Sequence, residues 1–319
     1  MRAVVIRRFG DPGGMAVVEI PVPTPPTDHV LIRTEAIGVG GVDAVIRRGT
    51  LGAGFRTGMI PGSEVAGIVE AVGASVDSSW IGRRVWAFTG TDGGYAEHTL
   101  APVGELVPIP ESLASVDAVT LGSAATVAHF ALAHAHLSAG ESVLVRGAAG
   151  SIGIATVELA RRGGAKAIAV TTSSVERGLQ LKRLGATELL SRSGQSDSPV
   201  PKQFDVIIDI VGGPDMPAFL DRLAPNGRMI LVGAVAGLPP ENFGSRLLRA
   251  FQQSRSFATF SLASIPLEAR DTVRAEVFDA AVRGELHPIV HAVMPLDHAA
   301  EAHRQMDLGA VLGRIVLTP

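Results

Sequence analysis

A run of small residues between an apolar segment and a helical pattern could bind a dinucleotide. Residues 143–153 read VLVRGAAGSIG, and Ala148, Gly150 and Gly153 occupy the three positions of the dinucleotide-binding fingerprint, with Ala in place of the first Gly. Small residues let a pyrophosphate approach the backbone, and the N-terminus of the following helix offers N–H groups and partial positive charge. The competing interpretation is a tight turn without a ligand. We predict that the cofactor contacts Ala148, Ala149, Gly150, Ser151, Ile152 and Gly153.

The end of the next apolar segment favours NADPH over NADH. NAD-binding proteins usually carry an acidic residue about 20 residues further on, where it binds the ribose 2′-hydroxyl. This sequence instead has TTSS at residues 171–174, followed by Arg177. Hydroxyls and a guanidinium suit a 2′-phosphate, because arginine can bind it with two hydrogen bonds. The predicted 2′-phosphate site consists of Thr172, Ser173, Ser174, Arg177 and, after the following strand, Arg192.

The sequence lacks the side chains of a thiol or metal site. It contains no cysteine, which excludes disulfides, thiolate catalysis and cysteine-ligated zinc. His129, His134 and His136 are close in sequence but do not share one helical face. We therefore predict that the protein holds no metal ion.

Composition restricts the class of protein further. The chain has 319 residues, of which 46 % are hydrophobic and 18 % charged, enough for two folded domains. Its net charge of -3 argues against a nucleic-acid partner. We find no apolar run of membrane-spanning length and no signal-peptide core, so we predict a soluble, cytoplasmic protein without a membrane partner. Lysine is scarce among the 28 basic residues, which hints at a bacterium with a GC-rich genome.

Two patterns of secondary structure divide the chain. The first hundred residues show short apolar strands broken by Gly and Pro, with one helix near 42–48, which predicts a compact β-rich domain. Its expected strands span residues 3–7, 30–34, 65–71, 84–87 and 95–100. After about residue 115, apolar strands alternate with helices, which predicts βαβ units around a parallel sheet. The strands expected there span residues 142–146, 167–172, 204–210 and 228–232, and the helices span 123–136, 152–162, 175–184 and 215–223.

The tail from about residue 266 has a different pattern. It predicts a helix at 268–283, a strand at 287–290, a helix capped by Asp297 and a last strand at 314–317. We expect this tail to pack on the first domain. The predicted fold is therefore an α/β protein with a β-rich domain of residues 1–120 and 262–319. A doubly wound, nucleotide-binding domain of residues 121–261 is inserted into it.

Several motifs, taken in order and at family spacing, resemble the medium-chain dehydrogenase/reductase superfamily. Its zinc-free quinone oxidoreductase branch, the zeta-crystallin-like group, is the most similar. The motifs are AIGV at 36–39 followed by Asp43, PGSEVAG at 61–67, GGYAE at 93–97, GAAG at 147–150, DIVGG at 209–213 and GRIVL at 313–317. The resemblance covers nearly the whole chain. It implies a GroES-like β domain, an inserted Rossmann domain, and an active site in the cleft between them.

The resemblance also assigns residues to the cofactor. Thr126 matches a family threonine near the nicotinamide and phosphates, and residues 232–234 fall where the family chain passes the nicotinamide. The cofactor residues implied in this way are Thr126, Val211, Val232, Gly233 and Ala234. Because many relatives are dimers or tetramers, we expect a homodimer or homotetramer.

The sequence departs from its relatives around the substrate. Gly40 and Ser63 stand where zinc-dependent relatives have their cysteine and histidine ligands. Quinone reductases of the branch usually carry Asn at Gly40, and often tyrosines at Val45 and Leu51. We therefore expect a pocket with more room and fewer hydrogen-bond donors than a typical quinone site.

These residues suggest direct hydride transfer from the nicotinamide C4 to a small apolar acceptor. Since the ligands for a catalytic zinc are missing from the sequence, acceptors already activated by conjugation are favoured, namely quinones and α,β-unsaturated carbonyls. The proton that the acceptor needs could come from solvent or from one of the candidate catalytic residues, which are Asp43, Ser63 and Thr126. Helix capping is the competing interpretation of Asp43.

Two other functions remain open at this stage. An enoyl-thioester or enone reductase of the same superfamily would be favoured by a basic entrance patch, for which Arg246, Arg249 and Arg255 are candidates. A non-catalytic NADPH-binding protein is the alternative from another class. Binding of NADPH without its oxidation by any member of a broad panel of acceptors would support that alternative.

Overall fold

The computed structural model describes residues 1–50, 52, 54–196 and 200–319, and the chain divides into two compact units. Unit 1 comprises Met1–Ser123 and Leu267–Pro319, and unit 2 comprises Ala124–Pro266. The joins expected from the sequence, after residue 120 and before residue 262, lie a few residues from these. Leu51 lies outside the described residues.

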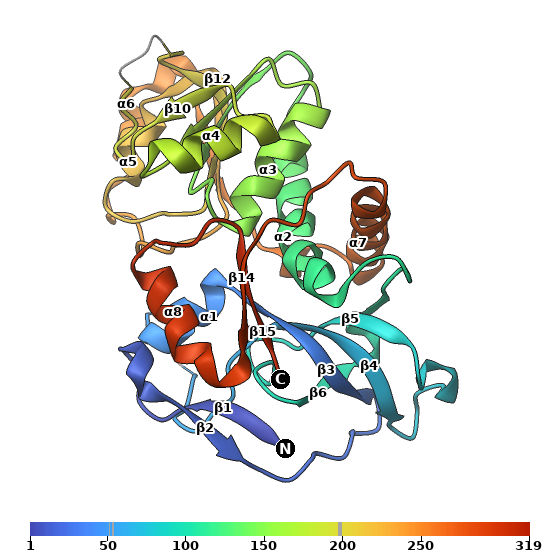
Figure 1. Cartoon of the computed structure of the whole chain (residues 1–319). Helices are drawn as coiled ribbons and strands as arrows, with labels where there is room; N and C mark the ends of the chain where they lie inside the picture. Colours follow the sequence, from blue (N-terminus) through green and yellow to red (C-terminus); the bar gives the residue numbers. More distant parts are fainter. Residues whose placement is uncertain (51, 53, 197–199) are drawn as a thin grey trace. The chain divides into compact units, whose positions relative to one another are not determined.

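Unit 1 is built on a sheet centred on one long strand, β3 (His29–Val39). The strand order is β14-β15-β3-β4-β5-β7, and β6 also pairs with β3. The remaining elements are β4 (Glu64–Val72), β5 (Arg84–Phe88), β6 (His98–Pro102), β7 (Leu106–Pro108), β14 (Val290–Pro295), β15 (Arg314–Thr318), α1 (Gly41–Arg48), α7 (Leu267–Val282), α8 (Ala299–Asp307) and a hairpin of β1 (Arg2–Ile6) and β2 (Met15–Glu19). Helix α8 lies beside α1 (Figure 1). The C-terminal segment thus completes the sheet begun by the first hundred residues.

Unit 2 contains a parallel sheet with the strand order β10-β9-β8-β11-β12-β13. Its strands are β8 (Ser142–Arg146), β9 (Ala167–Thr171), β10 (Glu188–Leu190), β11 (Phe204–Asp209), β12 (Leu223–Leu231) and β13 (Ser256–Thr259), and its helices are α3 (Ser151–Arg162), α4 (Val175–Leu184), α5 (Met216–Leu220) and α6 (Ser245–Arg249). From β8 the chain adds β9 and β10 towards one edge of the sheet, and from β11 it adds β12 and β13 towards the other edge. This reversal is the topological switch point of a doubly wound sheet, where such folds bind their ligands. The predicted α/β fold class is confirmed.

The structure corrects several expected elements. The helix expected at 215–223 spans only Met216–Leu220, because the chain joins β11 again at Leu223, which pairs with Phe204. The strand expected at 287–290 instead runs from Val290 to Pro295, parallel to β15. Asp297 lies within a single 3₁₀ turn, and α8 begins after it at Ala299.

Helix α2 (Ser115–His134) is long and apolar enough to cross a membrane by length and composition alone. The expectation that no apolar run reaches that length was therefore wrong. Most of the helix is buried within the protein, however, and Ala118, Ala125 and Ala131 have no exposed surface. Such small buried residues allow close packing, which is the pattern of a core helix.

Candidate nucleotide-binding and catalytic site

The fingerprint loop has the geometry that a dinucleotide requires. Strand β8 ends at Arg146, Gly147 turns the chain with φ +87°, and Gly150 is the N-cap of α3. A Cβ on Gly153 would lie 2.5 Å from the Cα of Ala148, so the close packing of helix on loop admits only glycine there. A Cβ on Gly150, by contrast, would meet nothing closer than 3.9 Å. The loop therefore leaves room for a phosphate at the start of α3, where N–H groups favour an anion.

The predicted 2′-phosphate residues gather at the end of β9. The hydroxyl of Ser174 accepts a hydrogen bond from the backbone N–H of Arg177 (3.2 Å) and so caps α4. The guanidinium of Arg177 donates from Nη1 to Oγ of Ser173 (3.3 Å). These side chains are at least partly exposed, and an anion between them would meet one charged and two hydroxyl groups.

Arg192 belongs to the same edge of the sheet. Strand β10 pairs with β9, and the N–H of Thr172 donates to the carbonyl of Leu190 (2.9 Å). The turn that carries Arg192 therefore follows directly after this junction, and its side chain is exposed. Its role as a second phosphate ligand stays a prediction.

The two other predicted cofactor segments are tied to each other. The N–H of Val232 donates to the carbonyl of Asp209 (2.7 Å), and the N–H of Ala236 donates to the carbonyl of Val211 (2.8 Å). A Cβ on Gly233 would lie 2.7 Å from the carbonyl oxygen of Ile210. The segments after β11 and β12 thus form one surface at the carboxyl end of the sheet, with Ala234 within it.

The three candidate catalytic residues are divided between the units. Asp43 and Ser63 belong to unit 1, and Thr126 belongs to unit 2. Thr126 is fully buried in α2, and Ser63 is nearly so, immediately before β4. Their roles as proton donors stay predictions.

Glu64 and Arg314 form a buried ion pair beside the positions where zinc-dependent relatives have ligands. Both side chains are buried, and the guanidinium of Arg314 donates to Oε1 of Glu64. The other carboxylate oxygen accepts from Nε1 of Trp86 (2.9 Å) and from the backbone N–H of Ser123 (3.2 Å). Glu64 is therefore fully engaged in holding unit 1 together. Sequence reasoning missed this pair, although the motif GRIVL contains its arginine.

No group of three or more metal-ligating side chains occurs among the described residues. Gly40 and Ser63 supply none of the nitrogen or sulfur ligands that a structural or catalytic zinc needs.

Asp43 sits where a helix-capping residue is needed. Its Oδ2 accepts from the backbone N–H of Gly40 (2.8 Å), the N-cap of α1, and from the hydroxyl of Tyr95 (3.4 Å). Its Oδ1 is buried without a hydrogen-bond partner in the described part of the chain. Tyr95 in turn contacts Nε2 of His303 (3.0 Å), whose Nδ1 accepts from Nε of Arg47 (3.4 Å). Since the arginine is always a donor, this chain of hydrogen bonds is directed towards Asp43.

Burial raises the pKa of Asp43 to about 6, against the hydrogen bond from Gly40 and the charge of Arg314. Burial, together with the charge of Arg47, lowers the pKa of His303 to about 3. Folded Asp43 therefore keeps a proton between pH 4 and 6 that the unfolded chain has lost. Its contribution to stability consequently grows as the pH falls through this window.

We expect Asp43→Asn to be more stable than the wild type at pH 8, by roughly 1–3 kcal/mol, and to lose this advantage near pH 4.5. The amide oxygen can still accept from Gly40 but carries no buried charge. Urea midpoints of both proteins across this pH range test the prediction. His303 titrates with the opposite sign in both proteins and cancels in the difference. A constant difference at all pH values would show that Asp43 does not titrate as stated.

A hollow of about 360 Å³ lies apart from the fingerprint loop, beside α5 and α6. Arg246 and Arg249 line it together with Asn242 and Ser245, and Arg246 also pairs with Asp221. Arg255, the third candidate for a basic entrance, does not line it. The structure thus brings two of the three arginines together.

Comparison with known proteins agrees with both units. Residues 26–111 match the family model of the alcohol dehydrogenase GroES-like domain, and residues 184–317 match the model described as zinc-binding dehydrogenase. The quinone oxidoreductase of Mus musculus is 32 % identical over 328 residues, which cover 99 % of this chain and 97 % of that protein. The chain belongs to the quinone oxidoreductase family of medium-chain dehydrogenases/reductases. The zinc in the name of the second model describes other members, since Gly40 and Ser63 occupy ligand positions here.

Other family members differ in the reactions that their names describe. A mycobacterial protein solved in complex with NADPH has a TM-score of 0.91 and 29 % identity, with full coverage of both chains. The 2-haloacrylate reductase of a Burkholderia species is 29 % identical over 337 residues, covering 99 % of this chain and 98 % of that protein. Membership of the family therefore establishes the fold but does not identify the acceptor that is reduced.

Proposed function

We propose that this protein, an NADPH-dependent oxidoreductase by its family, transfers hydride to a quinone or another conjugated carbonyl without the help of zinc. The observation that carries the proposal is the pairing of the uncrowded backbone at Gly150, where a Cβ would meet nothing closer than 3.9 Å, with the Ser173–Arg177 contact at the next strand end. The first suits a pyrophosphate and the second a 2′-phosphate. Together they match NADPH.

The bound nicotinamide would supply the hydride, and the protein's own residues bind and orient it. Ser151, Ile152 and Gly153 begin α3 and would hold the pyrophosphate, while Arg177 would hold the 2′-phosphate. Val211 and residues 232–234 form the surface against which the nicotinamide would rest. The proton needed by the reduced acceptor would come from solvent, from a hydroxyl such as Ser63 or Thr126, or from Asp43, which also caps α1.

The second candidate is reduction of an enoyl thioester. Arg246 and Arg249 around the hollow at α6 could bind the phosphates of a coenzyme A or phosphopantetheine arm. One relative of 29 % identity is part of a mycobacterial polyketide synthase subunit, of which the match covers 15 %. The named 2-haloacrylate reductase also favours an activated alkene as acceptor.

An acceptor panel with the matched variant Arg249→Glu distinguishes these functions. We expect the wild type to oxidise NADPH with a quinone or a simple enone. The reaction is measured as the loss of NADPH absorbance at the nicotinamide band. For these acceptors Arg249→Glu should leave KM within about twofold. A tenfold or larger rise in KM, confined to an enoyl-coenzyme A acceptor, would favour the thioester function. NADPH binding without turnover on any acceptor would favour the non-catalytic alternative.

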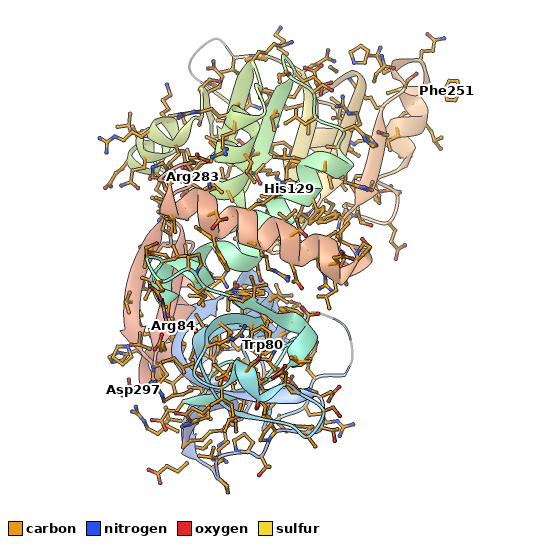
Figure 2. The ribbon with its side chains drawn as sticks, turned by 90° about the vertical axis from the view of Figure 1, so that its right-hand side faces the viewer. Trp80, Arg84, His129, Phe251, Arg283 and Asp297 are labelled. Carbon is orange, nitrogen blue, oxygen red and sulfur yellow. The ribbon has the colours of Figure 1, made fainter. Side chains whose placement is uncertain are left out.

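The protein's assembly and location are further proposals. Leu248 and Phe251 are largely exposed next to the edge strand β13, and Phe251 projects outward from its turn (Figure 2). Exposed apolar side chains at a sheet edge suit a homodimer or homotetramer. We propose a cytoplasmic oligomer that binds a small apolar substrate, with no nucleic-acid or membrane partner. Light scattering of Leu248→Asp and Phe251→Asp variants would test the interface.

A further inference from the structure

We propose that Arg146 and Asp209 are a positioning pair that fixes the nicotinamide side of the cofactor crevice. The inference rests on the proposed function, because it assumes that unit 2 binds NADPH. It assigns a role to two buried charged residues that neither touch a phosphate site nor belong to the fingerprint. The role is to hold the loop after β8 and the loop after β11 at a fixed distance from one another and in a fixed conformation.

The pair spans the switch point of the sheet. Strands β8 and β11 are neighbours, and Arg146 and Asp209 are the last residues of each, aligned with one another in the register. The crevice of a doubly wound sheet opens beyond the carboxyl ends of these two strands. An ion pair at this position forms the floor of the crevice.

The contacts of the pair reach the backbone of the loop after β11. Nη1 of Arg146 donates to Oδ2 of Asp209 (2.9 Å) and to the carbonyl of Gly212 (2.6 Å). Oδ1 of Asp209 accepts from the N–H groups of Val211 (2.8 Å) and Gly212 (3.1 Å). The pair thus satisfies two N–H groups and one carbonyl of the loop. Other bonds of the loop, from Ala236 to the carbonyl of Val211 and from Gly213 to the carbonyl of Gly237, tie it to the segment after β12.

This loop needs such support because its conformation is unusual. Gly212 and Gly213 both have positive φ, at 63° and 74°, which lies outside regular sheet or helix. The loop also touches the fingerprint, since a Cβ on Gly147 would lie 3.0 Å from Cγ2 of Val211. A shift of residues 211–213 would therefore change the shape of the crevice on both sides.

The pair is costly to bury, which suggests a role beyond stability. Asp209 has no exposed surface, and the Arg146 side chain is 5 % exposed. Burial raises the pKa of Asp209, while the charge of Arg146 and the backbone donors oppose that rise. Buried ion pairs often add little net stability over apolar residues of similar size. The guanidinium also lies over the ring of Phe219, 4.4 Å from its centre, which fixes its orientation.

A second arginine–carboxylate pair in unit 2 provides a matched control. Arg228 donates to both carboxylate oxygens of Glu141 (2.8 and 2.7 Å). Glu141 immediately precedes β8, and Arg228 of β12 aligns through β11 with Val143, so this pair lies towards the amino ends of β8 and β11. It holds the sheet together on the side away from the crevice.

The test compares Asp209→Asn and Arg146→Lys with Arg228→Lys. In the full-length protein we expect the first two variants to bind NADPH at least tenfold more weakly, by fluorescence titration, and Arg228→Lys to bind within twofold of the wild type. Binding of 2′,5′-ADP, which lacks the nicotinamide half, should stay within twofold in all three. Thermal midpoints measured alongside identify any variant that fails to fold, in which case the remaining crevice variant decides.

Equal NADPH affinity in all variants would overturn the positioning role. An equal loss of NADPH and 2′,5′-ADP would also overturn it, because the effect would then be a general loss of the fold. If the wild type itself binds no NADPH, the proposed function fails instead, and the result is distinguishable from both.

Discussion

Replacing Arg177 by glutamate is expected to remove the preference for NADPH over NADH. The guanidinium lies at hydrogen-bond distance from Ser173 at the end of β9, where the 2′-phosphate of NADPH would bind. Loss of one charged hydrogen bond costs about 2 kcal/mol, which corresponds to a roughly 30-fold weaker complex. The introduced carboxylate would repel the phosphate further. NADH, which has a hydroxyl there, should bind at least as well as before.

Fluorescence titration of both nucleotides measures this change directly. Arg183→Glu is the matched control, because it makes the same change of charge near the other end of α4. Its NADPH affinity should stay close to that of the wild type. Equal binding of NADPH and NADH by the wild type would refute the 2′-phosphate site, and so would equal losses in the two variants.

Replacing Glu64 by methionine is expected to destabilise the protein by about 3–5 kcal/mol. The change removes the carboxylate partner of buried Arg314 and the acceptor of the Trp86 indole N–H. A buried arginine without its counter-charge is costly, whereas the pair can often be replaced as a whole. The double variant Glu64→Met with Arg314→Met should therefore recover a large part of the loss. Urea denaturation at pH 7 provides the measurement.

An exposed pair serves as the comparison for this prediction. Glu301 and Arg304 interact within α8, and both side chains are about half exposed. Glu301→Gln should change stability by no more than about 0.5 kcal/mol. A similarly small effect of Glu64→Met would mean that Glu64 does not stabilise unit 1, and its buried contacts with Arg314 and Trp86 would need another explanation.

The nucleotide unit was the part most open to prediction from the sequence. Its strands are apolar and continuous, and its helices have clear starts and stops, such as Ser174 and Gly185 around α4. The loop between β8 and α3 carries a motif whose glycine at 153 is required because the close packing leaves no room for a side chain. Local sequence therefore determined local structure in these elements, whereas the end of α5 and the strand β13 of the same unit depended on partner strands.

The polar network of unit 1 could not be predicted in the same way. Glu64 and Arg314 are 250 residues apart, and Tyr95 and His303 are 208 residues apart. No local pattern signals such pairs, because their partners meet only when β15 and α8 return to the sheet. The short strands β2, β7 and β13 were also missed, since each is defined by its partner strand more than by its own composition.

The pairing of β3 with β15 has a consequence for the order of folding during synthesis. Val39 lies opposite Ile315, so the central sheet of unit 1 stays incomplete until the segment around residue 315 has left the ribosome. Unit 2, which is one continuous segment, can acquire its native form earlier. The nascent chain must therefore keep the apolar edge of β3 from aggregating while the inserted unit folds. Pairing across so long a stretch of chain is intrinsically slow, which makes closure by β15 the expected late step.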